Sequence, residues 1–123
     1  MMIASHKDQA WKIPRVFYRT SAGTEPVLDW LRSLSSADRK EVGRDLMRTQ
    51  WRWPVGMPLC RPMKSGLWEV RSNLPSDRIA RVLFCTHANQ WVASHGFIKK
   101  TQKTSPTDLE LPAMQRMKEV LAT

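Results

Sequence analysis

The sequence holds few of the residues that build metal sites or disulfides. Its 123 residues include two cysteines, Cys60 and Cys85, and three histidines. Neither cysteine stands at a metal-ligand spacing from the other or from a histidine, so we expect reduced thiols, no zinc and no other cofactor. No apolar run approaches the roughly 18 residues of a membrane-spanning helix, and residues 1–10 are too polar for a signal peptide. These absences favour a cytoplasmic protein with no membrane partner.

Acidic residues are also scarce. Eleven Asp and Glu face twenty Lys and Arg, which gives a net charge of +9 and an isoelectric point near 10.3. The excess is concentrated in residues 59–104, where eight residues are basic and two are acidic. Segregated positive charge points to a polyanionic partner, nucleic acid first and an acidic protein second. Solubility alone would not require the charge to be segregated.

The length and composition fit one domain over residues 13–123, preceded by a flexible leader over residues 1–12 that is polar and lacks periodicity. Alternation predicts a first strand at residues 13–19. Apolar residues at helical spacing then predict two helices, the first capped by Thr24 and the second by Ser35 or Ser36. The basic face of the second helix is more often a solvated surface than a site.

The second half of the sequence is predicted to form a loop, three strands and a helix. The loop covers residues 55–66, and the strands cover 67–72, 78–86 and 90–98 as an antiparallel meander. A last helix opens at Pro106 and should be kinked or reset by Pro112. We therefore predict an α+β fold with a small antiparallel, mixed-edge sheet of four strands, two N-terminal helices on one face and a C-terminal helix.

Alternation along the strands predicts which side chains share a face. Glu69 and Arg71 should share one face of their strand, whereas Arg81 should lie opposite Arg78. Strict alternation also places four residues of the last strand on one face: Trp91, Ala93, His95 and Phe97. Arg71 and Arg78 flank one short turn and should lie near each other.

These arginines and the following lysines suggest a phosphate site, because Arg offers a forked donor and Lys a movable point charge. On RNA, the 2′-hydroxyl can attack the adjacent phosphate without a metal. Arg71 and Arg78 would then stabilise charge, since arginine does not readily release a proton. A lysine whose pKa is lowered by neighbouring cations, or His95, would move the proton.

Each of these residues also has a simpler interpretation. Glu69 and Arg71 could form an ordinary strand pair, and His95 could be a core histidine with its hydrogen bonds satisfied. Lys99, Lys100 and Lys103 could form a solvated turn. The tryptophans are more often core or rim residues than base-stacking platforms, although an exposed one would stack on a base.

Three blocks of the sequence resemble the RelE/HigB-type toxins of bacterial type II toxin-antitoxin systems, and in particular the phage-derived HigB-like branch. They are the first-helix block VLDWLRSL, the GLWEVR block at residues 66–71 leading into RIAR at 78–81, and the block GFIKKTQKTSP at residues 96–106. The resemblance covers roughly residues 15–121. The chain departs from the pattern at Ser105 and Pro112, which affects the position of the last helix.

The resemblance implies a RelE-like fold and a metal-independent endoribonuclease that cuts mRNA on the ribosome. It also implies a cognate antitoxin of the helix-turn-helix, HigA-like kind, with operator DNA contacted only through that antitoxin. By position, the catalytic candidates are Arg71, Arg78, Lys99 and Lys100, with His95 as a weaker addition. RNA-binding candidates are Lys64, Arg81 and Lys103.

Two other functions remain open on the sequence. A non-catalytic nucleic-acid-binding module, or an inactivated toxin relic, would use the same charges for affinity without cleavage. The third hypothesis is that a basic groove binds an acidic partner protein. Toxicity on expression and cuts in translated mRNA would distinguish the enzyme from both.

Overall fold

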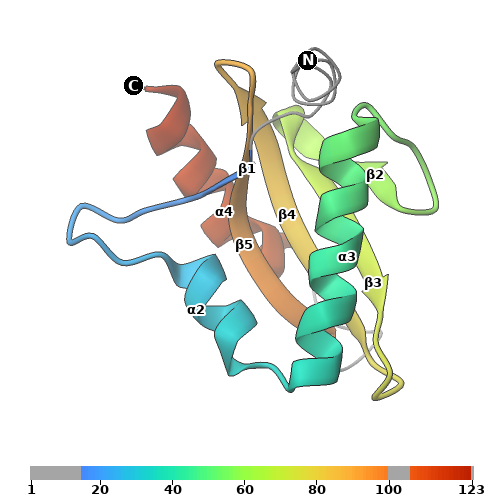
Figure 1. The fold of residues 1–123 in the computed structure, drawn as a ribbon. Coiled ribbons are helices and arrows are strands. Elements are labelled where there is room, and N and C mark those ends of the chain that lie inside the picture. Colours follow the sequence, from blue (N-terminus) through green and yellow to red (C-terminus); the bar gives the residue numbers. More distant parts are fainter. Residues whose placement is uncertain (1–14, 100–105, 123) are drawn as a thin grey trace, which may run out of the picture.

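The computed structural model describes residues 15–99 and 106–122 (Figure 1). The elements in chain order are β1 (Arg15–Phe17), α2 (Pro26–Ser33), α3 (Ser36–Arg52), β2 (Cys60–Pro62), the 3-10 helix η1 (Lys64–Gly66), β3 (Trp68–Asn73), β4 (Ile79–His87), β5 (Gln90–Lys99) and α4 (Pro106–Leu121). The predicted α+β class is confirmed. The predicted leader, residues 1–12, lies outside the described residues.

The sheet has five strands rather than the predicted four, in the order β1-β5-β4-β3-β2. β1 pairs with β5 in parallel, and the other three pairings are antiparallel. The extra strand is β2, which lies inside the segment predicted as loop. Three residues containing a proline carry too little alternation to be recognised as a strand, and β2 depends on its pairing with β3.

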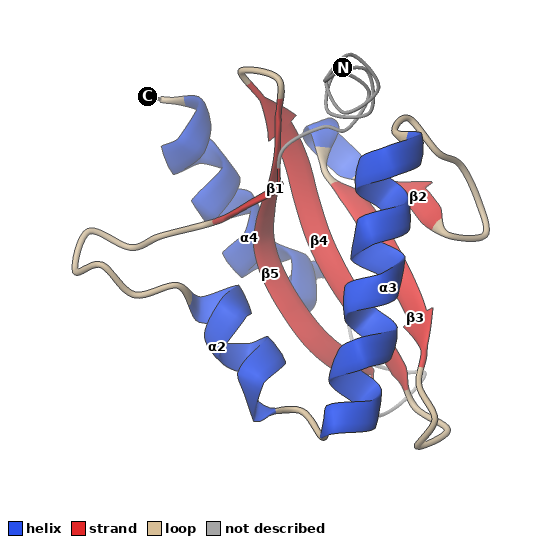
Figure 2. Cartoon of the chain, viewed as in Figure 1, coloured by secondary structure: helices blue, strands red, loops and turns tan. Residues whose placement is uncertain are grey.

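Helices α2 and α3 cover one face of the sheet, and α4 covers part of the other (Figure 2). Ser35 caps α3 as predicted, accepting a hydrogen bond from the Asp38 N–H at 3.2 Å. The predicted cap of α2 is wrong. Glu25 is the N-cap residue there and makes no side-chain cap bond. The hydroxyl of Thr24, the predicted cap, pairs instead with that of Thr20 at 2.6 Å.

The core between the sheet and the helices α2 and α3 combines aliphatic side chains with a group of packed aromatic rings. Phe84 stacks on Trp91 with ring centroids 4.4 Å apart, and Trp53 meets Phe84 edge-on at 5.2 Å. Phe84 and Trp91 are fully buried. Trp30 of α2 lies directly over Gly96, where a Cβ atom would be 2.5 Å from the indole ring. Glycine at position 96 therefore lets α2 approach β5 closely.

β5 carries one extra residue, which forms a β-bulge. Leu83 pairs with His95 and Phe84 pairs with Ala93, so Ser94 lies between two registers. The Ser94 hydroxyl donates a hydrogen bond to the Leu83 carbonyl at 3.1 Å. The bulge is thus held in place by a buried side chain.

Because of the bulge, side chains in the second half of β5 point to the opposite face of the sheet from the one that strict alternation predicts. Trp91 and Ala93 belong to the cluster under α2 and α3, whereas Phe97 packs against the cluster under α4. The prediction that Trp91, Ala93, His95 and Phe97 share one face is therefore wrong. Alternation has a period of two only where the strand is regular, and the sequence gives no separate signal for the bulge.

Helix α4 lies on the opposite side of the sheet, where Ala113 and Met117 are buried against β4 and β5. The helix is continuous through Pro112 rather than reset there. Pro112 is the seventh residue of the helix, past its first turn, and lacks the N–H that would bond to the carbonyl four residues earlier. Leu121, the last residue of the helix, is 51% exposed. None of the helices in the described part of the chain is long and apolar enough to span a membrane.

Candidate nucleic-acid interface

The face of the sheet that contacts α4 has two different halves. Leu83, Cys85 and Val92 form a buried apolar cluster with α4. The other half, on β2, β3 and β4, carries charged side chains in two adjacent rows across the strands. Arg61 lies opposite Glu69, and Arg71 lies opposite Arg81. Directly opposed residues point to the same side of a sheet, so all four belong to one face. We call these four residues the arginine surface.

A buried carboxylate stands at the centre of the arginine surface. Glu69 is 1% exposed, and its Oε2 atom lies 3.3 Å from Nη1 of Arg81 and 3.6 Å from Nη2 of Arg61. The side chains of Arg81 and Arg61 are 13% and 39% exposed. Burial lowers the pKa of Arg81, an effect that the charge of Glu69 opposes and the charges of Arg71 and Arg61 reinforce. The guanidinium remains charged at any physiological pH.

Arg71 is the exposed member of the arginine surface. It pairs across the strands with Arg81, and like charges in that position repel. The side chain has no ion-pair partner within 4.0 Å among the residues that the structure describes. Arg71 is therefore placed to bind an external anion. The prediction that Arg71 and Glu69 share one face is confirmed, but Glu69 forms its ion pairs with Arg61 and Arg81 rather than with Arg71.

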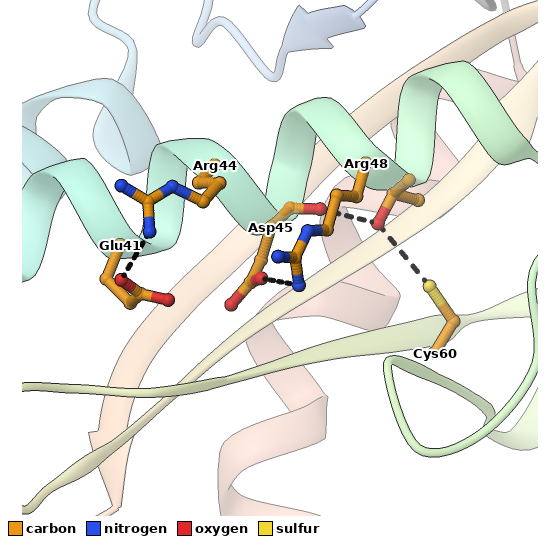
Figure 3. A network of polar contacts seen from close by, with 6 residues as sticks. Glu41, Arg44, Asp45, Arg48 and Cys60 are labelled. Carbon is orange, nitrogen blue, oxygen red and sulfur yellow. Dashed lines mark hydrogen bonds and ion pairs between the residues drawn. The ribbon is translucent and has the colours of Figure 1, made fainter.

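Arg71 also lines a cavity of about 370 Å³ at the edge of the sheet, between β3 and α3. Figure 3 shows the charged side chains of α3 at this edge: Arg44 pairs with Glu41 at 3.3 Å and Arg48 pairs with Asp45 at 3.4 Å. Burial raises the pKa of Asp45. The Thr49 hydroxyl reaches Cys60 Sγ at 3.5 Å, which connects α3 to β2.

Arg78 is not part of the arginine surface. Its Nη2 atom donates to Asp38 of α3 at 3.0 Å, and its Nε donates to the Ser76 hydroxyl, which also donates to Asp38. Burial alone would raise the pKa of Asp38, but the hydrogen bonds from Ser76 and Arg78 outweigh it and hold this pKa below 3.8. Arg78 thus joins the β3–β4 turn to α3, although half of its side chain stays exposed.

His95 lies on β5 opposite Leu83 and tilts toward Phe97, with ring centroids 5.6 Å apart. Burial, and then the charge of Arg116, lower its pKa below 6.5. Arg116 of α4 donates to the Ser94 carbonyl at 2.7 Å and lies 3.4 Å from His95 Nδ1. Since a guanidinium can only donate, Nδ1 is the acceptor and the neutral ring carries its proton on Nε2. His95 in this arrangement is a hydrogen-bond donor.

The structure describes only some of the candidate lysines. Lys99 is the last residue of β5 and pairs with Ile79, and Lys64 begins η1, next to β2. Lys100 and Lys103 lie outside the described residues. Within residues 15–99 and 106–122, no three His, Cys, Asp or Glu side chains gather to hold a metal ion.

Sequence reasoning missed Arg61 and Arg116. Arg61 was assigned to a loop because β2 was not recognised, and a residue without a strand cannot be given a face. Arg116 belongs to a helix whose contact with β5 depends on the bulge. The only signal in the sequence was the local excess of positive charge around residue 61.

A scan against protein-family models matches residues 29–118 to the phage-derived protein Gp49-like family (DUF891). The chain belongs to this family. It is a family of RelE/HigB-like, toxin-type proteins. The match begins within α2 and spans α3, the arginine surface and most of α4. No curated protein matches the chain.

Proposed function

We propose that this Gp49-like protein is the toxin of a toxin-antitoxin system and cuts mRNA on the ribosome without a metal. The observation that carries the proposal is the arginine surface, in which Arg61 and Arg81 pair with one buried carboxylate and Arg71 lies exposed beside Arg81. Three positive charges and one negative charge leave a net +2, which suits a phosphodiester approaching its doubly charged transition state. Family membership supports the toxin class.

The chemistry requires only groups that handle charge and protons. The ribose 2′-oxygen attacks the adjacent phosphorus, the bond from phosphorus to the 5′ oxygen breaks, and a 2′,3′-cyclic phosphate and a 5′-hydroxyl are formed. The proton of the 2′-hydroxyl passes to an acceptor, and the leaving 5′ oxygen takes a proton from a donor. Positive charge near the non-bridging oxygens stabilises the phosphorane.

The geometry favours particular roles for the candidate residues. Arg71, exposed beside Arg81, binds the reacting phosphate and stabilises its charge. His95 would donate a hydrogen bond from Nε2, because its Nδ1 is occupied by Arg116. The proton-handling role therefore falls to Lys99 or Lys100. Lys64 and Lys103 would hold the RNA on either side, and Arg78 would contribute from the turn through the exposed part of its side chain.

Further parts of the proposal concern partners. A ribosome would present the mRNA, and a helix-turn-helix, HigA-like antitoxin would neutralise the toxin in the cytoplasm and alone contact operator DNA. The basic charge of the chain supports an RNA target. An adjacent reading frame encoding a small helix-turn-helix protein would support the antitoxin.

The test is pulse expression followed by mapping of mRNA 5′ ends. The parent protein should arrest growth and produce new ends within translated frames. Arg71→Ala should reduce cleavage by about 10²–10³-fold, the usual effect of removing one charge-stabilising group. Arg39→Ala, which removes an exposed arginine of α3, is the matched control and should remain toxic. Equal toxicity of Arg71→Ala and the parent would show that the site is wrong.

The same experiment separates the alternative function. A harmless parent protein that yields no new ends, yet binds RNA and DNA with affinities that fall together as salt rises, would be a non-catalytic binding module. Arg78→Ala needs a stability measurement beside it, since this arginine also pairs with buried Asp38.

A further inference from the structure

The buried carboxylate of Glu69 is unusual in the number of polar atoms around it that lack partners. Arg81 and Arg61 both approach its Oε2 atom, while Oε1 has no hydrogen-bond partner. The Nε atoms of Arg61 and Arg81 are buried and also lack acceptors. An ion-pair network that served only stability would be expected to satisfy these donors.

The position of Glu69 explains how two arginines can be held close together. β3 lies between β2 and β4, so Glu69 stands between the strands that carry Arg61 and Arg81. One anionic oxygen draws both guanidinium groups toward the same point. Without it, two cations would face each other in a half-buried site and at least one would turn toward solvent.

The guanidinium groups keep donors available after pairing with Glu69. Each has five N–H donors in a fixed fork. The ion pairs use Nη2 of Arg61, which also donates to Met63 Sδ at 3.7 Å, and Nη1 of Arg81. The side chain of Arg61 is 39% exposed, so an anion can reach the pair from solvent. A phosphate oxygen is the acceptor that such paired forks fit best.

We propose that Glu69 is a positioning residue that holds Arg61 and Arg81 as a clamp for one backbone phosphate of the RNA, beside the phosphate bound by Arg71. This inference deepens the proposed function and rests on it for the identity of the ligand. It assigns a phosphate-binding role to Arg61 and a purely organising role to Glu69, which does not touch the RNA.

The Glu69→Gln variant distinguishes organisation from simple charge. Removing one negative charge from a basic surface should, by charge alone, tighten RNA binding. Loss of the clamp should instead reduce the cleavage step. In a reconstituted translation reaction, we expect kcat to fall about tenfold or more while KM does not rise. Glu25→Gln, which removes the carboxylate of a surface pair with Arg19, is the matched control and should leave kcat unchanged.

A double-mutant cycle tests whether Glu69 acts through the arginines. In an Arg81→Ala background, Glu69→Gln should cost little further activity, because the clamp is already broken. A structural role would give the same loss in both backgrounds and would overturn the proposal. Urea unfolding should be measured for every variant. If Glu69→Gln does not fold, Arg61→Lys takes its place: it keeps the charge, removes the fork and should lower kcat about tenfold.

A binding measurement keeps the clamp testable if cleavage is absent. An RNA oligonucleotide with 2′-O-methyl riboses cannot be cut by 2′-hydroxyl attack, and NMR of arginine Nε–Hε groups reports its contacts. Binding should shift the Arg61 and Arg81 signals together. Unshifted signals would refute the clamp whether or not the protein cuts mRNA. Shifted signals from a protein that leaves translated mRNA intact would uphold the clamp and refute the proposed function.

Discussion

The two faces of the sheet hold their side chains by different forces. The face under α2 and α3 packs aromatic rings: Phe84 contacts Trp91 and Trp53, and Trp53 meets Trp68 edge-on at 4.9 Å. The arginine surface on the other face is held by ion pairs around Glu69. Ring packing gains free energy from buried area. Burying charges costs free energy that their attraction barely offsets.

The difference indicates a division of labour within one sheet. The aromatic face contributes stability through buried area, whereas the arginine surface costs stability and is best explained by recognition of an anion. β3 and β4 contribute to both faces, so each strand carries core residues and candidate site residues in alternation. Mutations on the aromatic face should therefore lower the free energy of unfolding, whereas mutations on the arginine surface should lower activity.

The largest effect on stability should come from Phe84→Ala. Its ring is fully buried between two tryptophans, and its removal leaves a cavity that costs about 3–5 kcal/mol of unfolding free energy. Urea unfolding monitored by tryptophan fluorescence measures this. Met47→Ala on α3, where the side chain is 52% exposed, should change stability by less than about 0.5 kcal/mol. A small loss at Phe84 would mean that the aromatic face does not dominate stability.

Gly96→Ala should have the next largest effect. The new methyl group would overlap the Trp30 ring, whose Cε3 atom would be 2.5 Å away, and overpacking of this kind costs about 1–3 kcal/mol. Combining it with Trp30→Leu should recover part of the loss, because the smaller side chain leaves room. Equal or greater instability in the double variant would contradict the steric explanation.

Asp38 should make stability depend on pH in the acid range. Its pKa in the folded state lies below 3.8, so the stability it contributes is complete above that ordinary value and is lost as pH falls through the folded-state pKa. The difference in urea midpoint between the parent and Asp38→Asn should therefore shrink on acidification from pH 6 to pH 3. Asp77→Asn, in the exposed part of the following turn, should show no such trend.

The smallest effect should be electrostatic and local to His95. Arg116→Gln removes a nearby cation, so the pKa of His95 should rise toward 6.5. Proton NMR of the imidazole during a pH titration measures it. Lys118→Gln, an exposed cation on the same helix, should leave the midpoint unchanged. An equal shift in both variants would show that net charge, rather than the contact with Arg116, sets the pKa.

Much of the fold followed from the sequence. The long elements have clear signals: Ser35 caps α3, and the apolar residues Val42 and Leu46 recur at helical spacing and are fully buried. The same is true of the meander of β3, β4 and β5, whose turns occur near the predicted positions. Such segments are specified by local patterns, which do not depend on what packs against them.

The candidate site could be predicted only in part from such local sequence patterns. Glu69, Arg71 and Arg81 were placed on the right strands, and alternation put Glu69 and Arg71 on one face. The pairing of Glu69 with Arg61 could not be found, because it depends on a three-residue strand that exists only through tertiary pairing. The binding of Arg78 to Asp38 likewise joins residues 40 positions apart.

The bulge at Ser94 divides β5 into two segments whose side chains pack in different environments. Residues before Ser94 must suit the aromatic core, and residues after it must suit the surface near His95 and Phe97. Substitutions in one segment can be tolerated without reference to the other. Loss of a single residue elsewhere in either segment would instead turn side chains of that segment to the opposite face of the sheet. Insertions and deletions in β5 should therefore be far rarer among relatives than substitutions.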